Sequence, residues 1–101
     1  MSTQSIQSIS VKIHDGGILT LCDEDLFGKH FEDEKYSLHV TERFYKGESF
    51  TKEELVKALV VASSLNLVGK FSVQFALEEG FISEKDILYI QGVPHVQIYA
   101  L

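Results

Sequence analysis

Apolar and polar residues alternate in the first part of the chain, as in a strand with one buried face. Apolar residues occupy every second position from Ile9 to Ile13 and predict a strand formed by residues 9–14. Residues 15–17 are Asp-Gly-Gly, a tight-turn signal, because glycine accepts the positive φ that hairpin turns require. Residues 18–22 form the expected return strand of a β-hairpin.

The next segment is acidic and polar before the alternation returns. Residues 23–35 predict a loop, with one helical turn near residues 25–28. Apolar side chains at alternate positions predict a third strand over residues 36–41. This strand is expected to run on through residues 42–45 and to end at Lys46-Gly47.

Helical spacing of apolar residues then predicts two helices. Thr51 and Glu54 fit a capping box, in which two side chains satisfy free N–H groups of the first turn. The first helix is expected to end near Ser64, and residues 65–69 are interpreted as a connection. The second helix has Phe71, Phe75 and Leu77 on its apolar face and ends at Gly80, a residue suited to the C-terminal cap.

The C-terminal residues predict ordered structure, although chain ends usually fray. Residues 83–86 predict a turn, residues 87–90 a strand, residues 91–94 a second turn and residues 95–99 a last strand. The only proline, Pro94, lies in the second of these turns.

The predicted order is therefore β-β-β-α-α-β-β, which indicates an α+β fold. We expect an antiparallel or mixed sheet with two helices packed on one face. Residues 1–8 are expected to be a flexible lead-in, and residues 9–101 a single domain.

Charge narrows the classes of partner. The 101 residues include 15 acidic and 9 basic side chains, for a formal net charge of -6. Unaided binding of nucleic acid is disfavoured, because that affinity comes mostly from Lys and Arg neutralising phosphates. An acidic surface fits either a basic protein partner or solubility alone.

Cysteine use and the apolar stretches favour a cytoplasmic location away from membranes. Cys22 is the only cysteine, so no intrachain disulfide forms. Residues 1–10 lack the basic and apolar regions of a signal peptide. The longest apolar stretch, residues 55–61, is interrupted by Lys57 and is too short to span a bilayer.

His95 is the histidine with the most unusual setting. It follows Pro94, which restrains the backbone and holds the imidazole in one direction. It is either a structural histidine bonded to backbone or an acid/base group, and no partner for catalysis is visible in the sequence. His14 and His39 are expected on polar strand faces, and His30 in the acidic loop.

Neither a reactive thiol nor a metal site is indicated. Neighbouring carboxylates raise the pKa of a thiol, so Cys22 is interpreted as a small buried hydrophobe. The spacings typical of zinc sites are absent, and no cofactor is expected. A solvated acidic face is expected to include Asp23, Glu24, Asp25, Glu32, Asp33 and Glu34.

Arg43 is the only arginine and lies next to the aromatic pair Phe44-Tyr45. Its planar guanidinium suits a carboxylate, a phosphate or an aromatic face, although an ion pair with a nearby glutamate is the alternative. Asn66 and Gly69 precede the second helix, where they either help to hold an anion or simply cap and turn the chain.

Several pieces in a fixed order resemble a family of small archaeal proteins known as domain of unknown function 424. The pieces are Val11-Lys12-Ile13, Cys22-Asp23, Leu26-Phe27-Gly28-Lys29, Glu42 to Gly47, Asn66-Leu67-Val68-Gly69, Ser72-Val73, Glu78-Glu79-Gly80 and Gly92 to Gln97. The resemblance covers residues 11–98 and implies an archaeal cytoplasmic protein, with no known activity or cofactor. The chain departs from the family pattern at Lys70, where an acid is usual, and at Val96, where alanine is usual.

Three functions fit these residues. The first is a non-enzymatic interaction domain that binds a protein or ribonucleoprotein, in translation or other information processing. The second is a small-molecule binder or enzyme whose pocket joins His95, Arg43 and Asn66. The third is a homodimer formed through the C-terminal strand edge. The candidate binding residues are Arg43, Tyr45, Asn66, Gly69, Gly92, Pro94 and His95.

Overall fold

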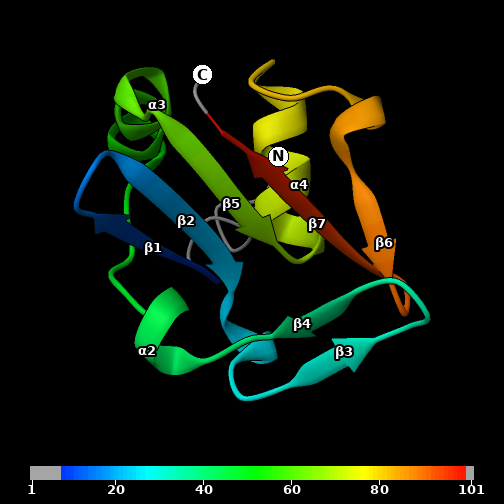
Figure 1. Cartoon of the computed structure of the whole chain (residues 1–101). Helices are drawn as coiled ribbons and strands as arrows, with labels where there is room; N and C mark the ends of the chain where they lie inside the picture. The colour runs from blue at the N-terminus through cyan, green and yellow to red at the C-terminus, as the bar shows by residue number, and fades with distance from the viewer. Residues whose placement is uncertain (1–7, 100–101) are drawn as a thin grey trace.

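The computed structural model describes residues 8–99 and has a five-stranded mixed sheet at its centre (Figure 1). The strand order is β1-β2-β5-β7-β6. These strands are β1 (Ile9–His14), β2 (Ile18–Asp23), β5 (Ser64–Val68), β7 (Val93–Ile98) and β6 (Leu88–Ile90). β2 and β5 run parallel, and the other neighbouring strands are antiparallel. The predicted α+β class and N-terminal hairpin are confirmed, and of the two predicted alternatives, an antiparallel or a mixed sheet, the structure has the mixed one.

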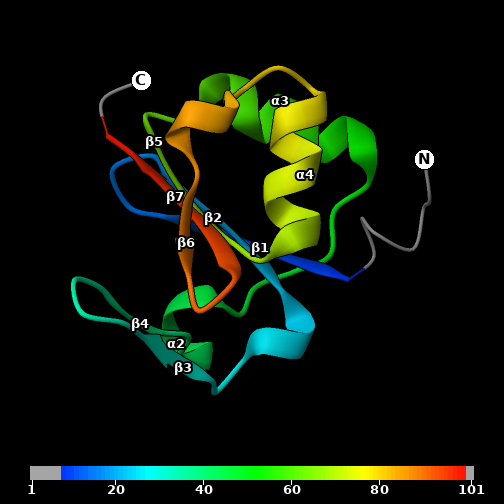
Figure 2. The same cartoon turned by 90° about the vertical axis from the view of Figure 1, so that its right-hand side faces the viewer.

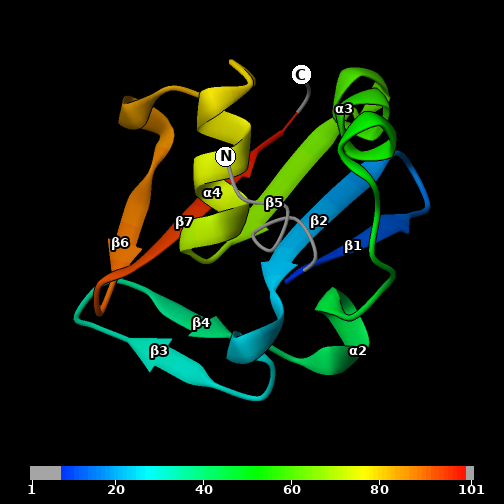
Figure 3. The same ribbon diagram turned by 180° about the vertical axis from the view of Figure 1, so that it is seen from behind.

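Two helices, α3 (Lys52–Val61) and α4 (Lys70–Glu78), cover one face of the sheet (Figures 2 and 3). The predicted capping box of α3 is present, with Thr51 Oγ1 accepting from the Glu54 N–H and Glu54 Oε1 from the Thr51 N–H. Between helices and sheet lies the larger core cluster: Ile9, Val11, Leu19, Leu21, Leu55, Leu59, Leu65, Leu67, Val73, Phe75, Ala76, Ile82 and Val96. Both helices therefore bury their apolar faces on the same side.

The opposite face is covered at one end only (Figure 1). The short helix α2 (Glu42–Tyr45) lies there with a two-stranded sheet of β3 (His30–Glu32) and β4 (Ser37–His39). The 3-10 turns η1 (Glu24–Leu26) and η2 (Glu84–Asp86) complete the described elements. The smaller core cluster beneath this cover consists of Cys22, Leu38, Val40, Tyr45, Val68 and Ile90. Within residues 8–99, no helix or second sheet covers the rest of this face.

The central strand β5 is the largest correction to the predicted order. Its residues were expected to connect the two helices, yet they pair with β2 on one side and β7 on the other. The run has only five residues and lies between two helical segments, so its short alternation of polar residues and leucines was interpreted as a connection. Its partners are far away in the sequence, and burial of Leu65 and Leu67 against the helices fixes it as a strand.

Residues 42–45 form helix α2, so the predicted continuation of the third strand is wrong. Thr41 ends the extended segment because its hydroxyl accepts a hydrogen bond from the Phe44 N–H, which caps a helical turn. The strand itself is shorter than expected and pairs with β3, a strand within the predicted acidic loop. Tyr45 is buried as a result of this turn.

The last strand begins at Val93 rather than His95 and lies between β5 and β6. The edges of the five-stranded sheet are therefore β1 and β6, and the C-terminal strand is not an edge. Residues 1–7 of the predicted lead-in lie outside the described residues. No helix within residues 8–99 has the length and apolar character needed to cross a membrane.

Candidate functional site

Asp23 links the end of β2 to the start of α4. Its carboxylate accepts hydrogen bonds from the Phe71 N–H at 3.0 Å and from the Ser72 N–H and hydroxyl at 2.8 Å. The side chain is only 2 % exposed, so its place on a solvated acidic face was a wrong prediction. Burial raises the pKa of Asp23, and the three hydrogen bonds oppose that shift. Within the described residues, an internal carboxylate thus occupies the N-terminus of α4, where an external anion was one of the two alternatives offered by the sequence.

Gly69 makes this junction possible. Its φ is 105°, a conformation that residues with a Cβ rarely adopt. A Cβ at this position would also overlap the Asp23 carboxyl group. The Gly69 N–H donates to the Pro94 carbonyl at 2.9 Å, which ties β7 to the same junction. The structure therefore accounts for Gly69 as a residue of close packing.

A small pocket of about 140 Å³ adjoins the junction. It is lined by Asp23, Asp25, Leu26, Gly69, Lys70, Gly92, Val93 and Pro94. Three predicted binding residues, Gly69, Gly92 and Pro94, meet here, and Lys70 lies beside them. Ligand pockets usually measure roughly 300–1,000 Å³, so this pocket is small for a metabolite.

His95 is buried on the face opposite α3 and α4. Its Nδ1 donates to the Leu67 carbonyl at 2.9 Å, which matches the structural alternative offered by the sequence. Burial lowers the pKa of His95, and the hydrogen bond to Leu67 opposes the shift. The neutral ring with hydrogen on Nδ1 is the form that this geometry favours.

The lowered pKa of His95 predicts that the stability of the protein depends on pH. The unfolded chain, with a histidine pKa near 6.5, binds a proton more readily than folded His95. The free energy of unfolding should therefore fall as the pH drops from 6.5 through the lowered pKa of the folded protein. His95→Gln, which keeps an N–H donor, should flatten this slope in urea unfolding followed across that range.

His14 is the matched control, because its pKa is also lowered but its ring is partly exposed. His14→Gln should flatten the slope less than His95→Gln. An unchanged slope in the His95 variant would contradict the structural account of this ring.

Tyr45 and Asn66 are brought together across the sheet. The Tyr45 hydroxyl donates to Asn66 Oδ1 at 3.2 Å. Burial, with smaller effects from Cys22 and Tyr99, raises the pKa of Tyr45 to about 12 despite that hydrogen bond. Tyr45 is therefore a neutral donor that orients the Asn66 amide.

Arg43 joins neither His95 nor Asn66 in the structure. Its backbone carbonyl accepts from Lys12 Nζ at 2.6 Å, whereas its exposed guanidinium has no partner within residues 8–99. Asn66 bonds to Tyr45 and His95 bonds to Leu67, so the predicted three-residue pocket receives no support from hydrogen bonding.

The chemistry expected of Cys22 agrees with its setting. The side chain is fully buried, and burial, followed by Asp23, raises the pKa of the thiol to about 12. The described part of the chain contains no group of three or more His, Cys, Asp or Glu placed to bind a metal.

The register reveals a row of polar side chains that sequence reasoning missed. Lys12 pairs with Thr20, Thr20 with Asn66 and Asn66 with Gln97, so one row crosses four strands. It lies on the face opposite α3 and α4, because paired residues share a face and their neighbours enter the larger core. The alternation of Ser64 and Asn66 with leucines was the available signal.

Aromatic side chains flank this row, with Phe44 contributed by the short helix α2 and Tyr99 by the residue that follows β7. The His14 and Phe44 rings stack with centroids 4.5 Å apart, and His14 Nε2 lies 3.4 Å from Thr20 Oγ1. Tyr99 is 72 % exposed, and its side chain contributes to the raised pKa of the buried Tyr45. We define the open sheet face as His14, Phe44, Asn66, Gln97 and Tyr99.

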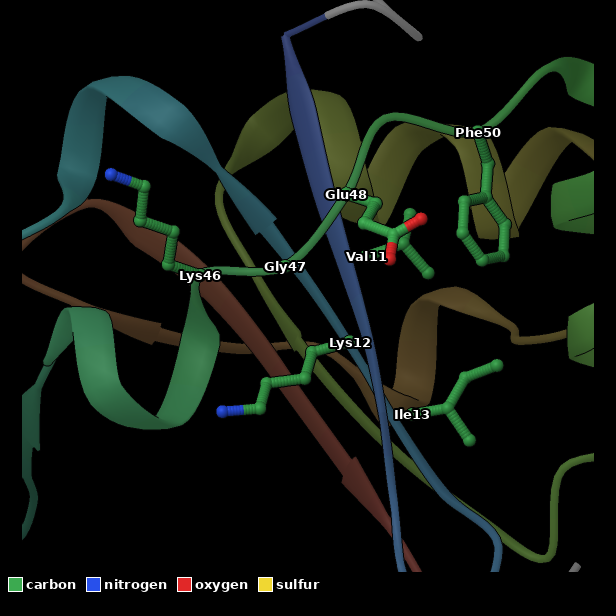
Figure 4. Close-up of a pocket in the computed structure, with 7 residues that line it drawn as sticks. All are labelled: Val11, Lys12, Ile13, Lys46, Gly47, Glu48 and Phe50. Carbon is green, nitrogen blue, oxygen red and sulfur yellow. The ribbon is translucent and has the colours of Figure 1, made fainter.

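A second hollow lies at the β1 edge of the sheet (Figure 4). We call it the edge groove; it has a volume of about 310 Å³ and is lined by Val11, Lys12, Ile13, Lys46, Gly47, Glu48 and Phe50. Gly47 passes so close to β1 that a Cβ would overlap the Val11 carbonyl.

Fold and site together define a small α+β protein with one sheet face covered by helices and one partly open. The chain belongs to the family described as "Protein of unknown function (DUF424)", which matches residues 11–101. It is also similar to a solved structure, "Crystal structure of an uncharacterized conserved protein from Methanopyrus kandleri". That likeness has 30% sequence identity and a TM-score of 0.76, and it covers 92% of this chain and 91% of the other. None of the curated proteins matches the chain.

Proposed function

We propose that this protein is a non-enzymatic interaction domain that binds a protein partner through the open sheet face. The observation that carries the proposal is the row of polar side chains across four strands, in which Thr20 is buried, Asn66 half-buried and Gln97 exposed, flanked by the exposed Phe44 and Tyr99. Exposed aromatic and amide side chains on a rigid sheet are suited to an interface, because little side-chain freedom is lost on binding.

The charge of the face favours protein over nucleic acid. Its defining residues include no lysine, arginine or carboxylate, and the chain carries a net charge of -6. Lys12 lies at one end of the row and is the only cationic residue in it, so the row itself supplies little attraction for a phosphate backbone. The proposed partner is thus a protein, or the protein part of a ribonucleoprotein. Identifying this partner would test whether the domain acts in translation or other information processing.

The test compares two exposed tyrosines on opposite faces of one sheet. Tyr99 belongs to the open sheet face, whereas Tyr89 of β6 is 60 % exposed and lines a hollow beside α4. Each is changed to alanine, and proteins captured from lysate of the source organism are quantified by mass spectrometry. We expect Tyr99→Ala to lower capture of the specific partner about tenfold or more, as for an interface anchor.

Tyr89→Ala should leave capture unchanged, and both variants should unfold at the urea midpoint of the wild type. If the two variants lose capture of the partner equally, or if neither substitution changes capture, the assignment of the open sheet face as the binding surface would be overturned. Binding that is lost on ribonuclease treatment would instead show that RNA bridges the two proteins.

A further inference from the structure

The outer edge of β1 carries an unpaired backbone site. Val11 exchanges both backbone hydrogen bonds with Glu48, each 2.8 Å long, and therefore points away from β2. Backbone direction alternates along a strand, so the Ile13 N–H and carbonyl point the same way. Within residues 8–99 neither of these Ile13 groups has a hydrogen-bond partner. The chain covers the edge at Val11 and leaves it open at Ile13.

The edge groove has two chemically different sides. Figure 4 shows the Lys12 and Lys46 side chains extending to one side of β1, while Ile13 and Phe50 lie on the other. Ile13 is 61 % exposed, although its position on the strand places it on the face of the larger core. An apolar side and a cationic side therefore flank one open strand edge.

The cationic side is unusual in an acidic chain. Lys12 lies on β1 and Lys46 directly follows α2, and Lys12 Nζ donates to the Arg43 carbonyl. Lys46 pairs with Glu42 at 3.6 Å, but both side chains are exposed, so this pair is weak and open to exchange. Glu48 lies on the other side of β1 in Figure 4, where it disfavours a second carboxylate.

We propose that the edge groove binds an extended segment of a partner protein in which acidic and apolar residues alternate. The segment adds a short strand to β1 by exchanging backbone hydrogen bonds with Ile13. Successive side chains of a strand point to opposite faces, so an apolar residue lies against Ile13 and Phe50. Its acidic neighbours then lie on the side of Lys12 and Lys46.

This site adjoins the open sheet face at Lys12 but has a different set of lining residues and a test of its own. A second copy of the chain would present Ile13 against Ile13 and leave the ammonium groups without anionic partners. Single-stranded RNA would meet Glu48 and the apolar side with its phosphates. The alternating acidic segment is the occupant that matches both sides of the groove.

The experiment titrates isotope-labelled full-length protein with an acetylated, amidated peptide of alternating Glu and Val. A peptide of the same composition with its Glu and Val residues in separate blocks is the matched control. We expect the alternating peptide to shift the amide signals of residues 12, 13 and 46–50 and to slow hydrogen exchange at Ile13. The blocked peptide should bind at least about fivefold more weakly, because only one side of the groove is matched.

Protein variants test the cationic side and the apolar side of the edge groove separately. Lys46→Gln should weaken binding by roughly twofold to fivefold, the range of one exposed ion pair, and Lys57→Gln on α3 should not. Ile13→Thr keeps strand propensity but removes apolar surface and should weaken binding, whereas Val61→Thr, also at an exposed site, should not.

Equal binding of the two peptides, or shifts confined to the open sheet face, would overturn the proposal. So would protection of Ile13 in concentrated protein without peptide, together with a doubled mass, because the edge would then pair with its own copy. Tighter binding of a uridine oligonucleotide than of the alternating peptide at these signals would likewise overturn it. None of these results depends on the Tyr99 test.

Discussion

Asp23→Ala should lower the free energy of unfolding by about 3 kcal/mol, the largest effect expected of any single polar side chain here. The change leaves the Phe71 N–H, the Ser72 N–H and the Ser72 hydroxyl without their acceptor. These groups lie at the positive end of α4, where a carboxylate is also favoured by the helix dipole. Urea unfolding followed by circular dichroism measures the loss.

Asp25→Ala is the matched control, since Asp25 is two residues away and exposed. Its effect should stay below about 0.5 kcal/mol, as is usual for surface substitutions. Equal urea midpoints for the two variants would contradict the role of Asp23 as the cap of α4. A result in the expected direction would mark the Cys22-Asp23 piece of the family resemblance as structural.

Elements with local signals were predictable from the sequence. The β1–β2 hairpin has an alternating pattern and a diglycine turn, and α3 has a capping box that the structure reproduces. α4 is followed by Gly80, whose positive φ of 81° suits the C-terminal end of a helix. Each of these signals depends on residues within one turn or one strand of each other.

β5 and the role of Asp23 were not predictable in the same way. β5 is defined by strands from both ends of the chain, and a parallel partner leaves no turn in the sequence. Asp23 stands at the start of an acidic run, so its composition resembles that of Glu24 and Asp25. Only the approach of α4, 48 residues later, distinguishes it.

The same limit explains the outcome for the candidate site. Tyr45 and Asn66 were predicted as binding residues independently of each other. The structure joins them by a hydrogen bond, because Asn66 lies on β5, the strand that the sequence prediction missed. Thr20 and Gln97 were not among the predicted binding residues, because the row that they share exists only when β5 pairs with both β2 and β7. A surface assembled from four strands can therefore be recognised once the order of the strands in the sheet is known, but not from the sequence of any single segment.

Gly69→Ala should destabilise the protein by at least about 2 kcal/mol, from backbone strain together with steric overlap. Alanine is strained at a φ of 105°, and its Cβ would overlap the Asp23 carboxyl group. Gly28→Ala separates the two causes, because Gly28 also has a positive φ of 83° but no atom lies within 4 Å of an added Cβ. That control should cost about 1 kcal/mol, measured in the same urea titrations.

A double-mutant cycle tests the contact itself. If the methyl group of Gly69→Ala displaces the Asp23 carboxylate, part of its cost is the loss of the α4 cap, which Asp23→Ala has already removed. Gly69→Ala should therefore cost at least about 1 kcal/mol less in the Asp23→Ala background than in the wild type. Gly28→Ala should cost the same in both backgrounds, since it lies outside the junction. Strict additivity of the Gly69 and Asp23 substitutions would show that the glycine is required for its backbone conformation alone.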